Sequence, residues 1–137
     1  PPRTADFEDT GGDFLADRQG QNPDLLPDDQ AAFIDAPEGT VVILGCAHAG
    51  ISNTLRQVRR LTGNRTIAMV IGGMHLNQAD PERLDRTIAE LRALNIPRLY
   101  PCHCTGFAAT ARLCQEFPGR VAPCPAGTVI DLTEPRS

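Results

Sequence analysis

The chain has 137 residues, of which 41% are apolar and 22% are charged. These values suit one globular domain and exclude a fully disordered or fibrous chain. No apolar run reaches the roughly 18 to 20 residues of a membrane-spanning helix, and no signal-peptide pattern opens the chain, so we expect a cytoplasmic protein away from membranes. Because the chain begins with Pro1-Pro2 and not with methionine, we expect it to be processed or part of something longer.

The net charge of -4 hides an asymmetry between the two parts of the chain. Residues 1–40 contain ten acidic residues and two arginines, whereas residues 41–137 contain seven acidic residues and eleven arginines. This basic excess is too dilute to predict nucleic-acid binding, but it is compatible with a small anionic substrate. Five cysteines, an odd number, favour reduced thiols with metal or catalytic roles over disulfides.

Residues 1–29 predict an irregular acidic arm, because glycines and prolines interrupt their scattered apolar residues. Residues 30–137 predict a domain that begins with a hairpin, whose strands at 31–34 and 41–44 flank Pro37-Glu38-Gly39. The following elements alternate: a helix over 50–62, a strand over 67–71, a helix from Asp80 to about Asn95, a strand over 98–101, a helix capped by Thr105, and a last strand over 128–132. This alternation indicates right-handed crossovers on a largely parallel sheet, and therefore the α/β class.

The third predicted helix has three large residues at helical spacing. Phe107, Cys114 and Phe117 are expected to share one face of it.

The three histidines recur at one position of the predicted βα units. His48, His75 and His103 each follow a predicted strand by two to four residues. The carboxyl ends of parallel strands meet at one edge of a sheet, where open α/β folds place their ligands. Imidazole is the commonest side-chain metal ligand near neutral pH, so the three histidines predict a divalent-metal site. For any one of them, a turn or partly buried structural role is the alternative.

Two further kinds of feature lie near these histidines. Cys46, Cys102 and Cys104 flank His48 and His103, but they lack the paired spacing of a zinc finger, and small buried thiols are the alternative. The helix starts near Gly50 and Thr105 predict free backbone N–H groups at the same edge, which can hold a phosphate or carboxylate. Ordinary βα turns would explain the glycines equally well.

Three segments resemble a known family: VVILGCAHAGI at 41–51, IGGMHL at 71–76 and LYPCHCTGF at 99–107. In order and spacing, over about residues 30–132, they resemble the C-terminal half of a metallo-β-lactamase-fold hydrolase. The particular branch is similar to 7,8-dihydropterin-6-methyl-4-(β-D-ribofuranosyl)-aminobenzene-5′-phosphate synthase. The resemblance implies an αβ/βα sandwich, of which this chain would supply the second sheet and its helices.

The resemblance also implies roles for individual residues. His48 matches the histidine that completes the first metal site, and His103 matches the late histidine of the second. His75 stands where the superfamily has a bridging aspartate, so it can bridge, bind one metal or contact substrate. Cys46 and Cys104 would hold the loops behind the metal ligands, and Thr105 and Gly106 would present backbone donors. Zinc is the first choice of metal because the site is rich in nitrogen, and manganese and iron are alternatives.

The superfamily motif H-x-H-x-D-H does not occur in these 137 residues. The resemblance therefore implies a missing N-terminal half or a partner chain, without which this chain is catalytically incomplete. The expected activity of the whole is hydrolysis of a small anion, phosphorylated or pterin-like, by metal-activated water. The alternative is a non-catalytic module that binds a metal or anion or serves as an interaction half. A sandwich lacking one sheet exposes an apolar face, so we expect a homo-oligomer or a partner on that face.

Overall fold

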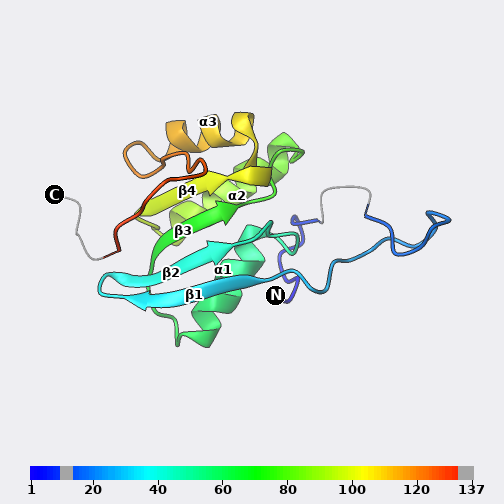
Figure 1. Ribbon diagram of the computed structural model, residues 1–137, viewed down its shortest axis with the longest axis horizontal. Coiled ribbons are helices and arrows are strands. Elements are labelled where there is room, and N and C mark those ends of the chain that lie inside the picture. Colours follow the sequence, from blue (N-terminus) through cyan, green and yellow to red (C-terminus); the bar gives the residue numbers. More distant parts are fainter. Residues whose placement is uncertain (10–13, 133–137) are drawn as a thin grey trace.

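The computed structural model describes residues 1–9 and 14–132, and it contains one sheet with helices packed on one of its faces (Figure 1). The elements, in chain order, are β1 (Ala31–Ala36), β2 (Gly39–Leu44), α1 (Ile51–Leu61), β3 (Ile67–Gly73), α2 (Pro81–Ala93), β4 (Arg98–Cys102), the 3-10 turn η1 (His103–Thr105) and α3 (Phe107–Glu116). None of the helices in the described ranges is long and apolar enough to cross a membrane.

The sheet has the strand order β1-β2-β3-β4. The hairpin strands β1 and β2 pair in antiparallel, whereas β2, β3 and β4 are parallel neighbours. Helices α1 and α2 connect the parallel strands, so the predicted α/β class is confirmed. The carboxyl ends of β2, β3 and β4 consequently lie along one edge, which is where the histidine-bearing loops begin.

The main core lies between the helices and one face of the sheet. In the registered strands, Val42 pairs with Val70, and Val70 pairs with Leu99, so these three side chains share that face. The buried residues that the helices pack against them are Ile51, Leu55 and Val58 of α1, Ile88 and Leu91 of α2, and Ala109 and Leu113 of α3. Burial of these apolar side chains fixes the three helices, and therefore the loops that precede them.

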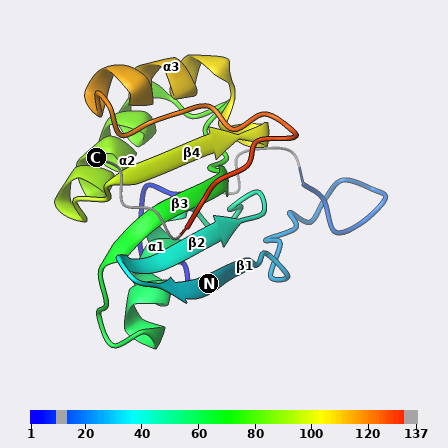
Figure 2. The ribbon, with the colours of Figure 1, turned by 60° about the vertical axis from the view of Figure 1, so that its left-hand side comes forward.

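The opposite face carries a smaller core that the chain covers with its own C-terminal segment. Val41, Met69 and Tyr100 are buried there. The segment after α3 contributes Ala122, Cys124, Ile130 and Leu132. Figure 2 shows this segment, in orange and red, running beside β4 and then over the sheet.

The predicted last strand over 128–132 is wrong. The backbone that pairs with β4 lies earlier: the N–H of Leu99 donates to Arg120 O at 2.8 Å, and the N–H of Ala122 donates to Leu99 O at 3.0 Å. The apolar run at 128–132 places Ile130 and Leu132 on the face of the sheet instead. Its apolar residues are buried by side-chain packing, which does not require a hydrogen-bonded ladder.

Helix α3 also differs from its prediction. Its N-cap is Gly106, without a side-chain cap, because the Thr105 hydroxyl accepts the Met74 N–H at 3.0 Å instead. Phe107 is 90% exposed, whereas Phe117 is buried in the main core. The predicted shared face of Phe107 and Phe117 is therefore wrong.

The first 29 residues contain neither a helix nor a named strand in their described part, yet residues 1–9 pack on α1 and α2, whereas the later loop of the arm extends away from them (Figure 1). The Glu8 carboxylate is buried and accepts the N–H groups of Ser52 and Asn53, both at 2.8 Å. The Asn53 side-chain oxygen in turn accepts the Ala5 N–H at 2.8 Å. Ion pairs at 2.6 Å join Arg83 to Asp9 and Arg86 to Asp6. The arm thus closes the N-terminal end of α1.

Candidate metal centre

Three loops meet at the carboxyl edge of the sheet, one after each parallel strand. The end of β3 and the loop after it are hydrogen-bonded to both other loops: Gly73 N–H, in the last residue of β3, donates to Gly45 O at 3.1 Å, and Asn77 N–H donates to Cys104 O at 3.1 Å. The bond from Met74 N–H to Thr105 adds a second link to the loop after β4. These cross-links hold the side chains of the three loops in fixed relative positions.

Each of the three loops contains a non-glycine residue with left-handed backbone. The φ angles are 55° at Ala47, 49° at His75 and 51° at His103. This region is sparsely populated by residues with a Cβ, and such conformations persist only where the surroundings enforce them, as they often do at functional sites. Two of the three residues are the predicted histidines.

His48 and His75 are in direct contact. Their ring centroids are 4.6 Å apart with the planes at 85°, and the Phe14 ring lies 5.1 Å from His48. The Asp29 carboxylate lies 3.8 Å from Nδ1 of His48 and also accepts the Ala49 N–H at 2.9 Å. Burial, followed by the neighbouring His75, lowers the pKa of His48 below its ordinary value. The neutral imidazole, which is the metal-binding form, is therefore favoured near neutral pH.

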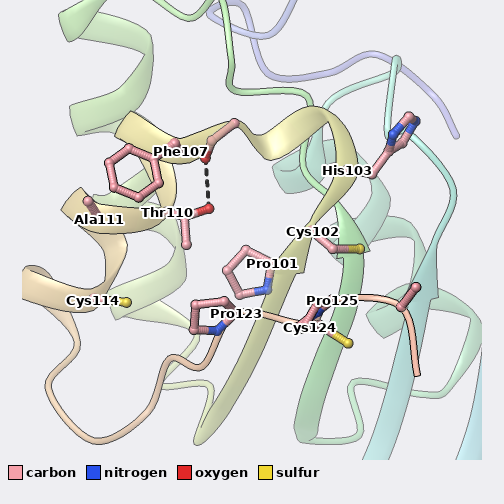
Figure 3. A pocket seen from close by; sticks show the side chains of 12 residues that line it. Pro101, Cys102, His103, Phe107, Thr110, Ala111, Cys114, Pro123, Cys124 and Pro125 are labelled. Carbon is pink, nitrogen blue, oxygen red and sulfur yellow. Dashed lines mark hydrogen bonds between the residues drawn. The ribbon is translucent and has the colours of Figure 1, made fainter. Parts of the chain in front are cut away.

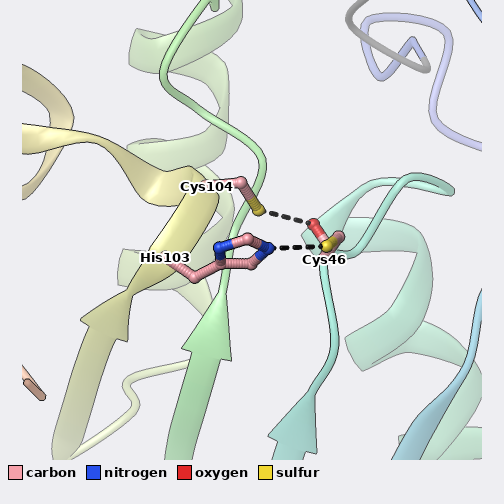
Figure 4. A group of neighbouring side chains, drawn as sticks. All are labelled: Cys46, His103 and Cys104. Carbon is pink, nitrogen blue, oxygen red and sulfur yellow. Dashed lines mark hydrogen bonds between the residues drawn. The ribbon is translucent and has the colours of Figure 1, made fainter. Parts of the chain in front are cut away.

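His103 belongs to a second group, with two thiols. Its Nε2 lies 3.0 Å from Cys46 Sγ, and the Cys104 thiol donates to Cys46 O at 3.3 Å. Figure 4 shows the three side chains pointing toward one another from the loops after β2 and β4. Burial raises the pKa of Cys104 to about 11, so this thiol stays protonated unless a cation replaces its proton.

A cleft of about 380 Å³ connects the two groups. Its lining includes His75 from the first group and His103 and Cys104 from the second, together with Phe14, Asn77, Gln78 and Gly106. Through this cleft and the contact between His48 and His75, the structure brings the three predicted histidines to one region of the sheet edge. Within the second group, Nε2 of His103 is hydrogen-bonded to Sγ of Cys46.

Some of the predicted anion-binding backbone groups, at the start of α1 and at Gly106, have partners within the described chain. At α1, the Glu8 carboxylate already accepts the N–H groups of Ser52 and Asn53, so the expectation of a free helix start near Gly50 is wrong. At α3, the Thr105 hydroxyl is bonded to Met74, and the Gly106 N–H donates to His103 O at 3.4 Å. Thr105 and Gly106 therefore shape the loop that carries His103.

Sequence reasoning missed three residues around the histidines. Asp29 could have been found, because the hairpin register that pairs Ala31 with Leu44 places residues just before β1 beside the loop after β2. Phe14 lies in the irregular arm, and Asn77 in a loop without regular pattern, so nothing in the sequence marked either as a neighbour of His75 or His103.

A larger apolar groove adjoins the cleft on the far side of His103. It has a volume of about 920 Å³ and lies between α3 and the segment 123–126. Figure 3 shows Phe107, Thr110 and Ala111 on one wall and Pro123 to Pro125 on the other. His103 and Gly106 line both spaces, so the groove and the cleft meet at the loop after β4.

Comparison with known proteins identifies relatives of this chain. No family model matches it. It is 33% identical over 107 residues to 7,8-dihydropterin-6-methyl-4-(β-D-ribofuranosyl)-aminobenzene-5′-phosphate synthase of Methanocaldococcus jannaschii, a match that covers 78% of this chain and 36% of the relative. An uncharacterised protein of the same organism is 33% identical over 75 residues, which cover 55% of this chain and 28% of that protein.

A solved structure matches most of the chain. The crystal structure of Tm1679, a metal-dependent hydrolase of the β-lactamase superfamily, superposes with a TM-score of 0.77 at 31% identity. The match covers 93% of this chain and 52% of that one, so the chain spans about half the length of the solved structure and about a third of the curated relatives. Sequence and fold together thus confirm the predicted resemblance: over the part that it spans, this chain has the fold of the metallo-β-lactamase superfamily.

Proposed function

We propose that this chain is the histidine-bearing part of a metal-dependent hydrolase that acts on small anionic substrates. The observation that carries the proposal is that His75 and His103, from two different βα loops, line one cleft, while His48, from a third loop, contacts His75. The match to a metal-dependent hydrolase at 31% identity supports the same activity class.

The donor atoms at this edge fit a divalent metal. The site offers imidazole nitrogens and thiols, a set that suits zinc first and manganese or iron less well. His48 and His75, which are in contact, would hold one ion, and His103 would hold a second. A bound divalent ion would lower the pKa of a coordinated water and stabilise negative charge that develops on the substrate.

The surrounding residues would keep the ligands in position. Asp29 faces the Nδ1 edge of His48, and a carboxylate behind a metal-binding imidazole fixes its orientation and increases its basicity. The hydrogen bonds among the three loops would prevent His75 and His103 from drifting apart when substrate enters.

The proposed substrate is a phosphorylated or pterin-like small molecule. The similar Methanocaldococcus protein is named for a product that contains a pterin and a phosphate. In this chain, the apolar groove beside His103 would receive the flat ring of such a substrate against Phe107, while its anionic group lies in the histidine-lined cleft. The bound metal ion and the anionic group of the substrate would then meet at the loop after β4.

We further propose that a complementary half of the fold, as a segment or partner chain, supplies the H-x-H-x-D-H ligands. Its sheet would cover the face on which Ile34 and Ile43 remain 44% and 41% exposed. The whole sandwich would then enclose the cleft between ligands from both halves.

Metal-dependent hydrolysis tests this proposal. The chain, alone and combined with a segment that carries H-x-H-x-D-H, is assayed with p-nitrophenyl phosphate and its diester in Zn²⁺ or Mn²⁺. We expect turnover from the combination only, and its loss in His48→Ala and His103→Ala. Arg60→Ala, on the exposed side of α1, serves as the matched control and should retain activity. A folded, metal-loaded combination that hydrolyses neither ester would favour the non-catalytic binding module.

A further inference from the structure

We propose that Cys46, His103 and Cys104 form a metal site of their own, in which both thiols bind a zinc-like ion directly as thiolates. The three donor atoms, Cys46 Sγ, His103 Nε2 and Cys104 Sγ, all lie within 4.8 Å of one another. This inference rests on the proposed function only in taking a divalent cation as the ligand. It changes the expected role of the cysteines from holding the loops to holding the metal.

The spacing of the donors is close to what a metal requires. A tetrahedral zinc ion with bonds of about 2.3 Å to sulfur and about 2.0 Å to nitrogen places its donors about 3.5 to 3.8 Å apart. Cys46 Sγ and His103 Nε2 are 3.0 Å apart without an ion, so small side-chain rotations suffice to admit one. Two thiolates and one imidazole leave the fourth position open for water or substrate, as in catalytic zinc sites.

The backbone around the thiols is built to bring them together. A Cβ on Gly73 would lie 2.7 Å from Cys104 Sγ and 2.6 Å from Gly45 O, so only glycine permits this approach of the two loops. His103 holds a left-handed backbone with φ of 51°, between Cys102, which lines the apolar groove, and Cys104, which lines the cleft. The cluster is also accessible, because His103 is exposed and both cysteines are partly exposed.

The thiols favour a particular class of metal. Thiolate is a soft ligand that selects zinc and similar ions over magnesium, calcium and manganese. The neighbouring pair of His48 and His75 has an oxygen and nitrogen environment instead, with Asp29 at 3.8 Å. One edge of the sheet therefore offers two chemically different positions, and the sulfur-rich one discriminates among metals.

Cobalt substitution tests the site, because sulfur bound to Co²⁺ gives a charge-transfer absorption in the near ultraviolet that a hydrogen-bonded thiol does not. The metal-free, reduced full chain is titrated with Co²⁺ alone without oxygen. We expect this absorption to appear with one equivalent and to disappear when Zn²⁺ is added. Cys46→Ser and Cys104→Ser should each remove about half of it, since each removes one of two thiolates, and His103→Ala should weaken Co²⁺ binding at least about tenfold.

Cys114→Ser, on α3 outside the cluster, is the matched control and should leave the absorption unchanged. Circular dichroism checks each variant, and if Cys104→Ser fails to fold, Cys46→Ser still carries the test. Co²⁺ binding without charge-transfer absorption, absorption that survives both cysteine substitutions, or no Co²⁺ binding would overturn the site. Absorption without hydrolysis by the combined halves would contradict the proposed function alone, and hydrolysis without absorption would contradict this site alone.

Discussion

Individual residues decide how closely the three loops can approach. The histidines and their place after successive strands could be read from the sequence, because strand ends and imidazoles recur together. Their division into two groups could not, because it depends on side-chain contacts such as Cys46 with His103 and His48 with His75. The segment IGGMHL contains Gly72-Gly73, and only the structure identifies which atoms approach these two glycines.

Gly73→Ala should separate the thiols of the candidate site. The added Cβ meets the backbone oxygen of Gly45 and the sulfur of Cys104, and overpacking of this kind costs about 1–3 kcal/mol of folding free energy. We expect a lower denaturation midpoint and a weaker cobalt charge-transfer absorption. Gly45→Ala is the control, since its Cβ would lie 3.5 Å from Gln30 O, an ordinary contact. Unchanged cobalt absorption in Gly73→Ala would contradict the described packing.

His48 should make the fold sensitive to mild acid. Its pKa in the folded state is lowered by burial and by His75, so below the ordinary value of 6.5 the unfolded chain binds more protons than the folded chain. The contribution of His48 to the free energy of unfolding is therefore present above pH 6.5 and is lost as the pH falls through the lower pKa of the folded state. Urea unfolding of the metal-free chain between pH 7.5 and 5 measures it, in steps of about half a pH unit. His48→Gln should flatten this part of the profile, and an equal slope in both proteins would refute the assignment.

At the scale of elements, a local capping signal predicted the start of α2 but not those of α1 and α3. The predicted helix start at Asp80-Pro81 is confirmed, since the Asp80 carboxylate accepts the Arg83 N–H at 2.7 Å. The start of α1 has no such local signal, because its cap is Glu8, which lies 44 residues earlier than Ser52. Long-range capping of this kind has no sequence spacing by which it could be recognised. The same reason explains why the packing of the irregular arm was not foreseen.

Glu8→Ala should destabilise the metal-free chain, because it leaves two buried N–H groups at α1 without an acceptor. Loss of a helix cap costs about 1–2 kcal/mol. Burial raises the pKa of Glu8 above its ordinary value, despite the opposing backbone hydrogen bonds. Its contribution is consequently largest below the unfolded value of 4.5 and is partly lost as the pH rises through the folded pKa.

Denaturant unfolding of the natural chain, Glu8→Ala and Glu8→Gln from pH 4 to 7 tests both the loss of the cap and its pH dependence. The stability difference between the natural chain and Glu8→Gln should narrow as the pH rises, because glutamine does not titrate. Asp6→Asn, an exposed residue of the same arm, is the control for general effects of removing charge. A difference that widens with rising pH would show that hydrogen bonding outweighs burial at Glu8.

In the whole molecule, helices cover one face of the sheet, and the other face is only partly covered. The helices bury the first face, and the C-terminal segment covers Val41, Met69 and Tyr100 on the second. The resemblance to half of a two-sheet sandwich predicted an uncovered second face, because it does not show that a later segment of this chain folds back over the sheet. In the structure, the part of this face that stays open lies beside the hairpin. There Ile34 pairs with Val41 and Ile43 pairs with Ala32, and both isoleucines remain partly exposed.

That remaining apolar area should cause the isolated chain to self-associate. In the complete sandwich a second sheet would cover it, and without that sheet a second copy of this chain is the available apolar partner. Sedimentation at micromolar concentration should therefore show a concentration-dependent increase in mass, and Ile34→Ser with Ile43→Ser should reduce it. Leu61→Ser, which removes a side chain that is 58% exposed on α1, is the matched control and should leave association unchanged. Because the substitutions lie away from the histidine loops, the monomeric variant should still bind cobalt. A natural chain that stays monomeric at every concentration would contradict this prediction and show that the C-terminal segment alone protects this face.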